Sequence, residues 1–242
     1  MLEEISESVK TYYKKRIVGF LYYGSRAFNK SSWSKDPDYD LVLVLKSRHN
    51  GDVAKLSEIV KTYNMNLDVI LVYEKEITGK GINNFQFGGH GSFVILYLSE
   101  AMTLIGKNPF AEVKDLVDLE AVNLSILRNI HHYFWRLEHK YIHECHDQEL
   151  INYFIKYIER ICLDILIVTK QISFSEHNFL SKGSLHEKIL NSSGCFSLRT
   201  KRAIKTILYK KQDYSIDDLV RLKASLLKDF TKIETVMYLN KY

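Results

Sequence analysis

The sequence is poor in the residues that interrupt or cross-link a chain. Only two prolines occur in 242 residues, Pro37 and Pro109, so the chain after Pro109 can form long helices without a break. The three cysteines, Cys145, Cys162 and Cys195, are widely spaced and form no C-x-x-C pair. This spacing argues against a disulfide framework and against a zinc site, and it fits a reducing cytoplasm, which is the location we expect.

Long apolar runs are absent as well. No run of about 18 apolar residues occurs, so we expect no membrane-spanning segment. The first residues, Met1 to Glu7, are acidic and lack the apolar stretch of a secretory signal. The length of 242 residues and the hydrophobic content of 46% allow one large domain or two small ones with a sizeable core.

The net charge of +5 is small but unevenly distributed. Between Phe196 and Tyr242, eleven Lys or Arg residues stand against five Asp or Glu residues, which gives 11 − 5 = +6. Such an excess favours a phosphate or nucleic-acid partner. The alternative interpretation is a solvated face of Lys-rich helices.

An apolar segment followed by a glycine and two acids organises the first half of the chain. Residues 17–23 are β-branched, aromatic and aliphatic and end at Gly24, which predicts a buried strand that stops at a turn. A polar loop follows, and Asp38 and Asp40 open a second apolar run at 41–45. Strand residues two apart share a face, so the two carboxylates repel each other unless a cation lies between them. Mg²⁺ is such a cation, because it binds oxygen ligands together with substrate phosphates.

A third acid follows on a later apolar segment. Asp52 can cap a helix that runs to about Tyr63, and residues 66–73 then read as another strand with Asp68 near its start. If this strand pairs beside the second one, Asp68 joins Asp38 and Asp40. Three carboxylates can hold two metal ions, one that activates an attacking oxygen and one that neutralises a triphosphate.

Gly24-Ser25, Asp38-x-Asp40 and the distal Asp68 together resemble the pattern of the polymerase-beta-type nucleotidyltransferase superfamily. The resemblance covers roughly residues 15–108. Within the superfamily, the chain is similar to minimal or antibiotic-type members that carry a C-terminal helical domain. It implies an α+β fold, in which a small mixed-sheet nucleotidyltransferase domain precedes an all-α helical bundle. It also implies two Mg²⁺ or Mn²⁺ ions, a nucleoside triphosphate donor such as ATP, and release of pyrophosphate (class EC 2.7.7).

The resemblance also assigns roles to individual residues. Asp38, Asp40 and Asp68 are expected to be both the catalytic residues and the metal ligands. Gly24 and Ser25 are expected to bind the nucleotide phosphates, and Arg26 is a further candidate for that contact or simply a surface arginine. The structural alternative is that Asp at a strand start and Gly-Ser in a turn serve only the local backbone.

The pattern changes to a helical period after residue 110, so we expect a catalytic domain at 1–110 and a helical substrate-binding or partner-binding domain at 111–242. The expected helices are about 112–145, 148–170, 184–191, 197–212 and 216–240.

The first of these helices carries a basic stripe. At about 100° per residue, four candidate acceptor or phosphate contacts share one side with His143 and His146: Arg128, His132, Arg136 and His139. The alternative is an exposed face that happens to be rich in histidine. Glu120, near the start of the helix, is a candidate general base.

The sequence leaves the acceptor and the oligomeric state open. The acceptor hydroxyl could belong to the 3′ end of an RNA, to a partner protein or to a small molecule such as an aminoglycoside. A rival hypothesis is a non-catalytic, antitoxin-like regulator that binds a nucleotide or a partner. A third is a ribonuclease, because Arg136-x6-His143 loosely resembles the motif of HEPN helical bundles.

Overall fold

The computed structural model describes residues 2–28, 39–63, 66–78, 81–82, 91–143, 148–209 and 214–239. The chain forms two compact units, Met1–Ser125 and Ile126–Tyr242, and each is described by itself. The division between them falls within a long helix. A domain boundary near residue 110 stays a prediction, because a division by contacts does not show which segments fold independently.

The first unit is built on a mixed four-stranded sheet with the order β3-β2-β1-β6. The strands are β1 (Ile17–Tyr23), β2 (Tyr39–Leu45), β3 (Leu67–Tyr73) and β6 (Met102–Gly106). β1 is antiparallel to β2 and β6, whereas β2 and β3 are parallel. The parallel pair requires a crossover, which α3 (Asp52–Thr62) supplies. The expected strand–helix–strand unit is therefore confirmed.

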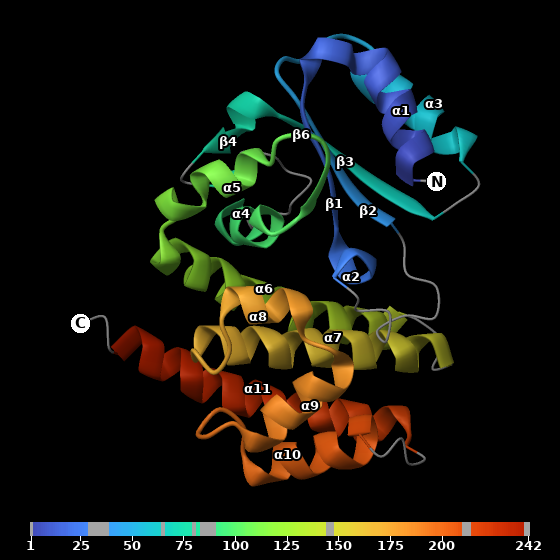
Figure 1. The fold of residues 1–242 in the computed structure, drawn as a ribbon. Helices are drawn as coiled ribbons and strands as arrows, with labels where there is room; N and C mark the ends of the chain where they lie inside the picture. The colour runs from blue at the N-terminus through green and yellow to red at the C-terminus, as the bar shows by residue number, and fades with distance from the viewer. Residues whose placement is uncertain are drawn as a thin grey trace. The chain divides into compact units, whose positions relative to one another are not determined.

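The two faces of this sheet are covered by different helices (Figure 1). Alternate residues of β2, including Leu41 and Leu43, pack with Val9 of α1 (Leu2–Tyr13) and with Leu56 and Ile59 of α3. On the opposite face, Tyr23 of β1 contacts Tyr97 of α4 (Gly91–Ser99). Because one face of β2 is fully apolar, its register is strongly specified.

Shorter elements complete the first unit. They are η1 (Lys14–Arg16), α2 (Gly24–Ala27), η3 (Glu74–Glu76), the two-residue strands β4 (Ile77–Thr78) and β5 (Gly81–Ile82), α5 (Pro109–Val113) and η5 (Lys114–Leu116). The expected helix start near residue 112 is wrong. Asn108 caps α5, and Asp118 separately accepts a hydrogen bond from the backbone N–H of Glu120 at 2.9 Å. The long helix α6 (Leu119–His143) therefore begins after a second cap.

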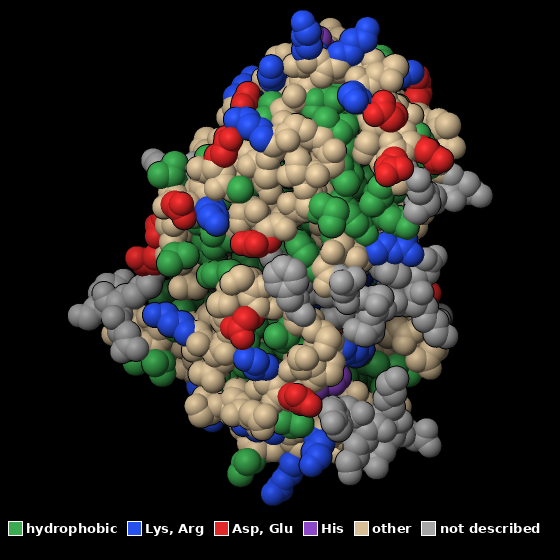
Figure 2. All heavy atoms as spheres, viewed as in Figure 1, with side chains coloured by type: hydrophobic (Ala, Val, Ile, Leu, Met, Phe, Trp, Pro, Cys, Tyr) green, Lys and Arg blue, Asp and Glu red, His purple; other side chains and the backbone are tan. Residues whose placement is uncertain are grey.

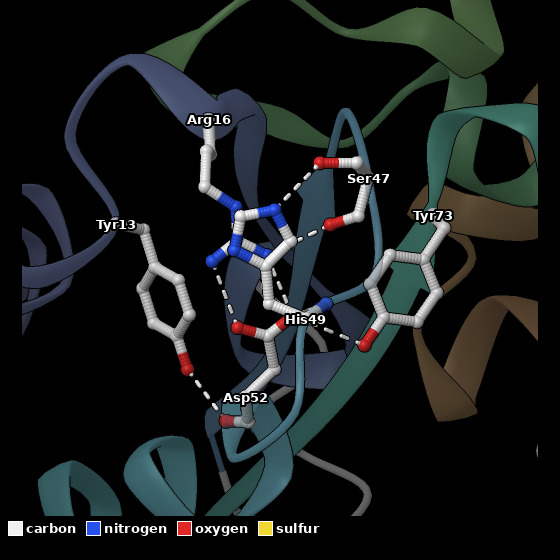
Figure 3. Close-up of polar contacts among 6 residues, drawn as sticks. All are labelled: Tyr13, Arg16, Ser47, His49, Asp52 and Tyr73. Atoms are coloured by element: carbon white, nitrogen blue, oxygen red, sulfur yellow. Dashed lines mark hydrogen bonds and ion pairs between the residues drawn. The ribbon is translucent and has the colours of Figure 1, made fainter.

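A polar cluster around the buried Asp52 connects α3 to the start of the sheet, and Figure 3 shows its six residues: Tyr13, Arg16, Ser47, His49, Asp52 and Tyr73. Arg16 donates two hydrogen bonds to the Asp52 carboxylate, at 2.9 and 2.6 Å. The backbone N–H of His49 and the hydroxyl of Tyr73 also donate to it. Burial raises the pKa of Asp52, but the hydrogen bonds from Arg16 and His49 outweigh that effect and hold the pKa below its usual value.

We predict that Asp52→Ala destabilises the first unit by about 3 kcal/mol, because it leaves the partly buried Arg16 without its counter-charge. Urea unfolding followed by circular dichroism measures this free energy. Glu58→Ala is the matched control, since it removes an ion pair that lies at the surface and should change stability little. Equal effects of the two substitutions would show that burial of the Asp52 pair contributes nothing.

The second unit is helical. Besides most of α6, it contains α7 (Gln148–Val168), α8 (Phe174–Phe179), α9 (Lys182–Asn191), α10 (Leu198–Ile204), the π-helical turn η6 (Lys205–Tyr209) and α11 (Ile216–Leu239). α8 was not expected from the sequence, although Ser173 and Glu176 form a capping box at its start. The expected helix at 197–212 is α10 followed by η6. None of the helices in the described ranges is long and apolar enough to cross a membrane.

A carboxyl group is buried within the second unit, on α7. Burial raises the pKa of Asp164 to about 8, although nearby Arg160 acts to lower it. The pKa of Tyr133 on α6 is raised to about 12. Burial of the ring is the largest cause, and the nearby Asp164 carboxyl is the second. Asp164 is therefore protonated in the folded protein at neutral pH, while it is ionised in the unfolded chain.

This raised pKa predicts a specific pH dependence. Below about pH 4 both states bind the proton, and the Asp164 contribution is fully present. It is lost as the pH rises from about 4 to 8, because only the unfolded state then releases the proton freely. Relative to Asp164→Asn, the wild-type free energy of unfolding should therefore fall by up to about 4 kcal/mol by pH 7. Urea unfolding of both proteins at several pH values measures it, and a constant difference would contradict the assignment.

Candidate functional site

Two acidic side chains lie next to each other at one end of the sheet. Asp40 and Asp68 are each the second residue of their strand, and the parallel register of β2 and β3 pairs them directly. Paired residues of neighbouring strands point to the same face. Asp40 is half-buried and Asp68 is exposed. Like charges in this position are unfavourable by themselves, so the pair fits a divalent cation that binds oxygen ligands.

Gly24 supports the Asp40 carboxylate from the neighbouring strand end. Tyr23, the last residue of β1, pairs with Asp40, and the chain then turns through Gly24 with φ +83°. A Cβ atom at Gly24 would lie 1.8 Å from Oδ2 and 2.6 Å from Cγ of Asp40. Only glycine is compatible with both the backbone angle and this contact. The predicted roles of Gly24 and Asp40 therefore involve two groups that touch.

Arg26 lies beside the same turn. Its guanidinium carbon is 4.1 Å from the centre of the Tyr39 ring, and Tyr39 stacks on Tyr22 with ring centres 5.9 Å apart. Burial, followed by the neighbouring Tyr39, raises the pKa of Tyr22 to about 12, while Arg26 acts to lower it. Because Tyr39 and Asp40 are consecutive in β2, they point to opposite faces. The contact of Arg26 with a phosphate stays a prediction.

Part of the predicted site lies outside what the structure describes. Asp38 is not among the described residues, and the side chain of Ser25 is not described. Within the described ranges, no group of three His, Cys, Asp or Glu residues could hold a metal ion. The two-metal arrangement of Asp38, Asp40 and Asp68 therefore stays a prediction, and the described part of it is the Asp40–Asp68 pair.

An aromatic cluster on the Asp40 face was not found from the sequence. The ring of Tyr97 lies 5.8 Å from that of Tyr23, 5.9 Å from Phe28 and 6.3 Å from Phe93. Because Tyr23 pairs with Asp40, the cluster is on the same side of the sheet as the carboxylate. The signal was the spacing of four residues between Phe93 and Tyr97, which places both on one side of a helix.

The basic stripe of the long helix is exposed as expected. Arg128, His132, Arg136 and His139 all belong to the second unit and have exposed side chains on α6. Arg136 donates from Nε to Nε2 of His132 at 2.9 Å, and from a terminal nitrogen to the hydroxyl of Tyr157 at 2.7 Å.

Partial burial and the charge of Arg136 lower the pKa of His132, so its ring is neutral at pH 7 and accepts that bond. His146 lies outside the described residues. The candidate base Glu120 is exposed in the first unit.

Comparison with known proteins yields a structural likeness. No protein-family model and no curated protein matches the sequence. Among solved structures, the chain is similar to spectinomycin adenyltransferase AAD(9) from Enterococcus faecialis, determined with ATP and spectinomycin. The likeness covers 96% of this chain and 98% of that chain, with a TM-score of 0.59 and 10% sequence identity. The fold is that of a nucleotidyltransferase.

This likeness confirms the expected fold class, an α+β nucleotidyltransferase fold with a C-terminal helical region. An identity of 10% establishes the fold and leaves activity, acceptor and metal to be argued from the residues of this chain. The positions that carry that argument are Asp40, Asp68 and Gly24.

The close approach of Gly24 to Asp40 predicts a difference between two glycine substitutions. Gly24→Ala and Gly51→Ala both place a side chain at positive φ, +83° and +88°, but a Cβ at Gly51 meets nothing within 4 Å. Both variants should lose about 1 kcal/mol of stability through the backbone. Only Gly24→Ala displaces the Asp40 carboxylate, so Mn²⁺ binding measured by calorimetry should weaken at least about tenfold in that variant alone. Equal Mn²⁺ affinity of the two would contradict the proposed contact.

Proposed function

We propose that the protein is a metal-dependent nucleotidyltransferase that moves a nucleoside monophosphate from a nucleoside triphosphate, with ATP as the first candidate, to an acceptor hydroxyl. The observation that carries the proposal is the Asp40–Asp68 pair. It places two carboxylates side by side on the end of a sheet in a nucleotidyltransferase fold, directly against a glycine at positive φ. Two acids in register on neighbouring strands repel each other, and a divalent cation that binds both carboxylates accounts for the pair.

In this reaction the acceptor oxygen forms a bond to the α-phosphorus, the bond to pyrophosphate breaks, and the hydroxyl proton leaves with the base or water that receives it. Bound Mg²⁺ or Mn²⁺ would neutralise the triphosphate and lower the pKa of the acceptor hydroxyl. Asp40 and Asp68, together with Asp38, are the residues that would hold the ions. Gly24 keeps the Asp40 carboxylate in place, and Ser25 and Arg26 are the proposed phosphate contacts.

The charges of the second unit bear on the acceptor. The solved structure that is similar to this chain was determined with spectinomycin. A small-molecule acceptor is therefore one candidate for this chain. Aminoglycosides carry several ammonium groups, and binding them requires acidic side chains. From residue 126 to 242 the chain has 19 Lys or Arg and 13 Asp or Glu, so its balance is 19 − 13 = +6. This charge favours an anionic acceptor over a cationic one.

The proposal is tested by incubating the protein with each α-³²P-labelled nucleoside triphosphate, Mg²⁺ or Mn²⁺, and three acceptor classes: small RNAs, a protein lysate and an aminoglycoside panel. We expect label to enter one class with release of pyrophosphate. Asp40→Asn and Asp68→Asn should each reduce the rate at least about 100-fold, because each removes a proposed metal ligand. Asp115→Asn, at an exposed position in η5, is the matched control and should keep the wild-type rate.

Two results would overturn the proposal. One is transfer that survives in Asp40→Asn, since the activity would then arise elsewhere. The other is wild-type protein that shows no metal-dependent nucleotide binding in calorimetry. Metal-dependent binding of ATP without transfer to any acceptor would favour the alternative, a nucleotide-binding regulator.

A further inference from the structure

A row of aromatic rings lines the outer face of α6 within the second unit. His132 and Trp135 stack with ring centres 5.6 Å apart and an interplanar angle of 20°. Trp135 and His139 are 5.2 Å apart, and His139 and His143 are 4.4 Å apart. We call these four residues the ring row. At about 1.5 Å per residue it extends along roughly 16 Å of helix.

The ring row lies at the surface. Trp135 is 54% exposed, and all three histidines of the row are exposed. A tryptophan whose ring is half in water gains little from core packing, and tryptophan is enriched where proteins meet partners. The row therefore has the composition of a contact surface.

Cationic side chains follow the ring row on the side that faces α7. Arg136 bonds to His132 of the row and to Tyr157 of α7. Lys140 lies 5.0 Å from the ring centre of Tyr153, and Arg160 lies 5.9 Å from that of Tyr157. These contacts hold the three cationic side chains in a line at the junction of α6 and α7. We call Arg136, Lys140 and Arg160 the cation line.

Glu138 is the acidic residue of α6 nearest in sequence to the ring row and the cation line, and its partner lies on α11. Glu138 forms an ion pair with Lys223 of α11, and His131 bonds to Glu234 of α11 at 2.7 Å. The side of α6 that faces α11 therefore carries compensated charges, whereas the cation line adds positive charge on the side that faces α7.

The two units also differ in overall charge. The second unit carries a balance of +6 and seven of the nine histidines, while residues 1–125 have 15 Lys or Arg against 16 Asp or Glu. On the face drawn in Figure 2, basic side chains of the first unit are interspersed with acidic ones. An asymmetry of this kind between the halves of a chain points to a polyanionic partner on the basic half.

We propose that the outer face of α6 binds single-stranded RNA, with unpaired bases stacked against the ring row and phosphates in contact with the cation line. Rings combined with a line of cations match a strand that has both bases and phosphates, and a duplex would keep its bases out of reach. RNA is chosen over DNA because its loops and ends normally expose unpaired bases. A length of about 16 Å accommodates three to five nucleotides at 3.4 Å or more each.

This surface also assigns the acceptor class, and that assignment rests on the proposed function. The RNA held on α6 would supply the hydroxyl that attacks the α-phosphorus of the nucleoside triphosphate. Binding of RNA to α6 itself requires neither the triphosphate nor the metal, so the two claims can be tested apart.

The binding test uses the full chain and a fluorescein-labelled 12-nucleotide RNA without structure, followed by fluorescence anisotropy in EDTA without nucleotide. Trp135→Ala should weaken binding about 5- to 100-fold, the range expected for one stacking contact, and leave the salt dependence unchanged. Arg136→Ala and Lys140→Gln should each reduce the slope of log K against log salt by about 0.7, as expected for one lost phosphate contact.

Two exposed positions outside the surface serve as matched controls. Tyr238→Ala, at a 47% exposed ring on α11, and Arg199→Ala, at an exposed position on α10, should bind RNA as the wild type does. Thermal unfolding by circular dichroism confirms that every variant is folded. Lys140→Gln keeps the bond between Arg136 and Tyr157, so it tests the charge even if Arg136→Ala disturbs the helix pair.

Wild-type affinity in Trp135→Ala would overturn the proposal, and so would tighter binding of duplex RNA or of the same strand as DNA. The acceptor assignment is tested by offering the same RNA with ATP and Mg²⁺. Label that enters the RNA and is lost in Trp135→Ala supports it. RNA that binds through Trp135 while label enters another acceptor class overturns the acceptor assignment, and RNA that binds while nothing is labelled speaks against the proposed function.

Discussion

The contact between the Asp40 carboxylate and Gly24 is the constraint on which the candidate site depends. The carboxylate lies where any side chain at position 24 would be, and it is paired in register with Asp68 on the other side. Both relations are consequences of strand pairing. A slip of β2 by one residue would exchange Asp40 for Tyr39 and turn the acid to the face packed by α1 and α3. The position of the Asp40 carboxylate in the candidate site therefore depends on the register of β2.

That register is held by groups far from the acids. Leu41, Leu43 and Leu45 are fully buried, and a slip would expose this whole set to the opposite face. At the other end of the strand, Arg16 and Asp52 join the start of β1 to the start of α3. Because α3 connects β2 to β3, this ion pair also helps to fix the strand that carries Asp68. The Arg16–Asp52 ion pair thus lies at one end of the sheet, and the Asp40–Asp68 pair lies at the other.

Much of the first unit could be predicted from the sequence, because its strands are short apolar runs bounded by glycine, acids and turns. The parallel pairing that brings Asp68 beside Asp40 followed from a helical segment between two such runs. The expected cap at Asp52 is wrong, because Gly51 is the N-cap and the Asp52 carboxylate binds Arg16 instead. The contact of Asp40 with Gly24 could not be predicted, since it depends on a positive φ and on a cross-strand pair, and neither leaves a periodic signal. The aromatic cluster around Tyr97 was missed for a related reason, because its members come from β1, from α4 and from Phe28, the residue after α2.

The helical unit shows the opposite pattern. The stripe on α6 was visible from periodicity alone, because five or more polar residues at helical spacing define a face without any knowledge of tertiary contacts. Periodicity did not predict the role of Trp135. This residue belongs to the ring row because His132 and His139 lie about one turn away on either side of it. The ring of Trp135 is 54% exposed, which the spacing of apolar residues alone does not show.

The charges of that unit limit what can be transferred from proteins of the same fold. The solved structure of the same fold is 10% identical in sequence, so the likeness shows the fold and leaves every side-chain role to be argued from this chain. The proposed metal ligands would act on the triphosphate, which is common to all acceptors. The acceptor is selected by other side chains, whose charges are free to differ. A balance of +6 over residues 126–242 repels a polycationic acceptor and attracts a polyanion, and it does so over distances near the Debye length of about 8 Å at physiological salt. Electrostatic attraction alone would hold any polyanion equally. The ring row supplies the discrimination, because only a polyanion with unpaired bases gains the stacking energy of Trp135 and its neighbouring histidines.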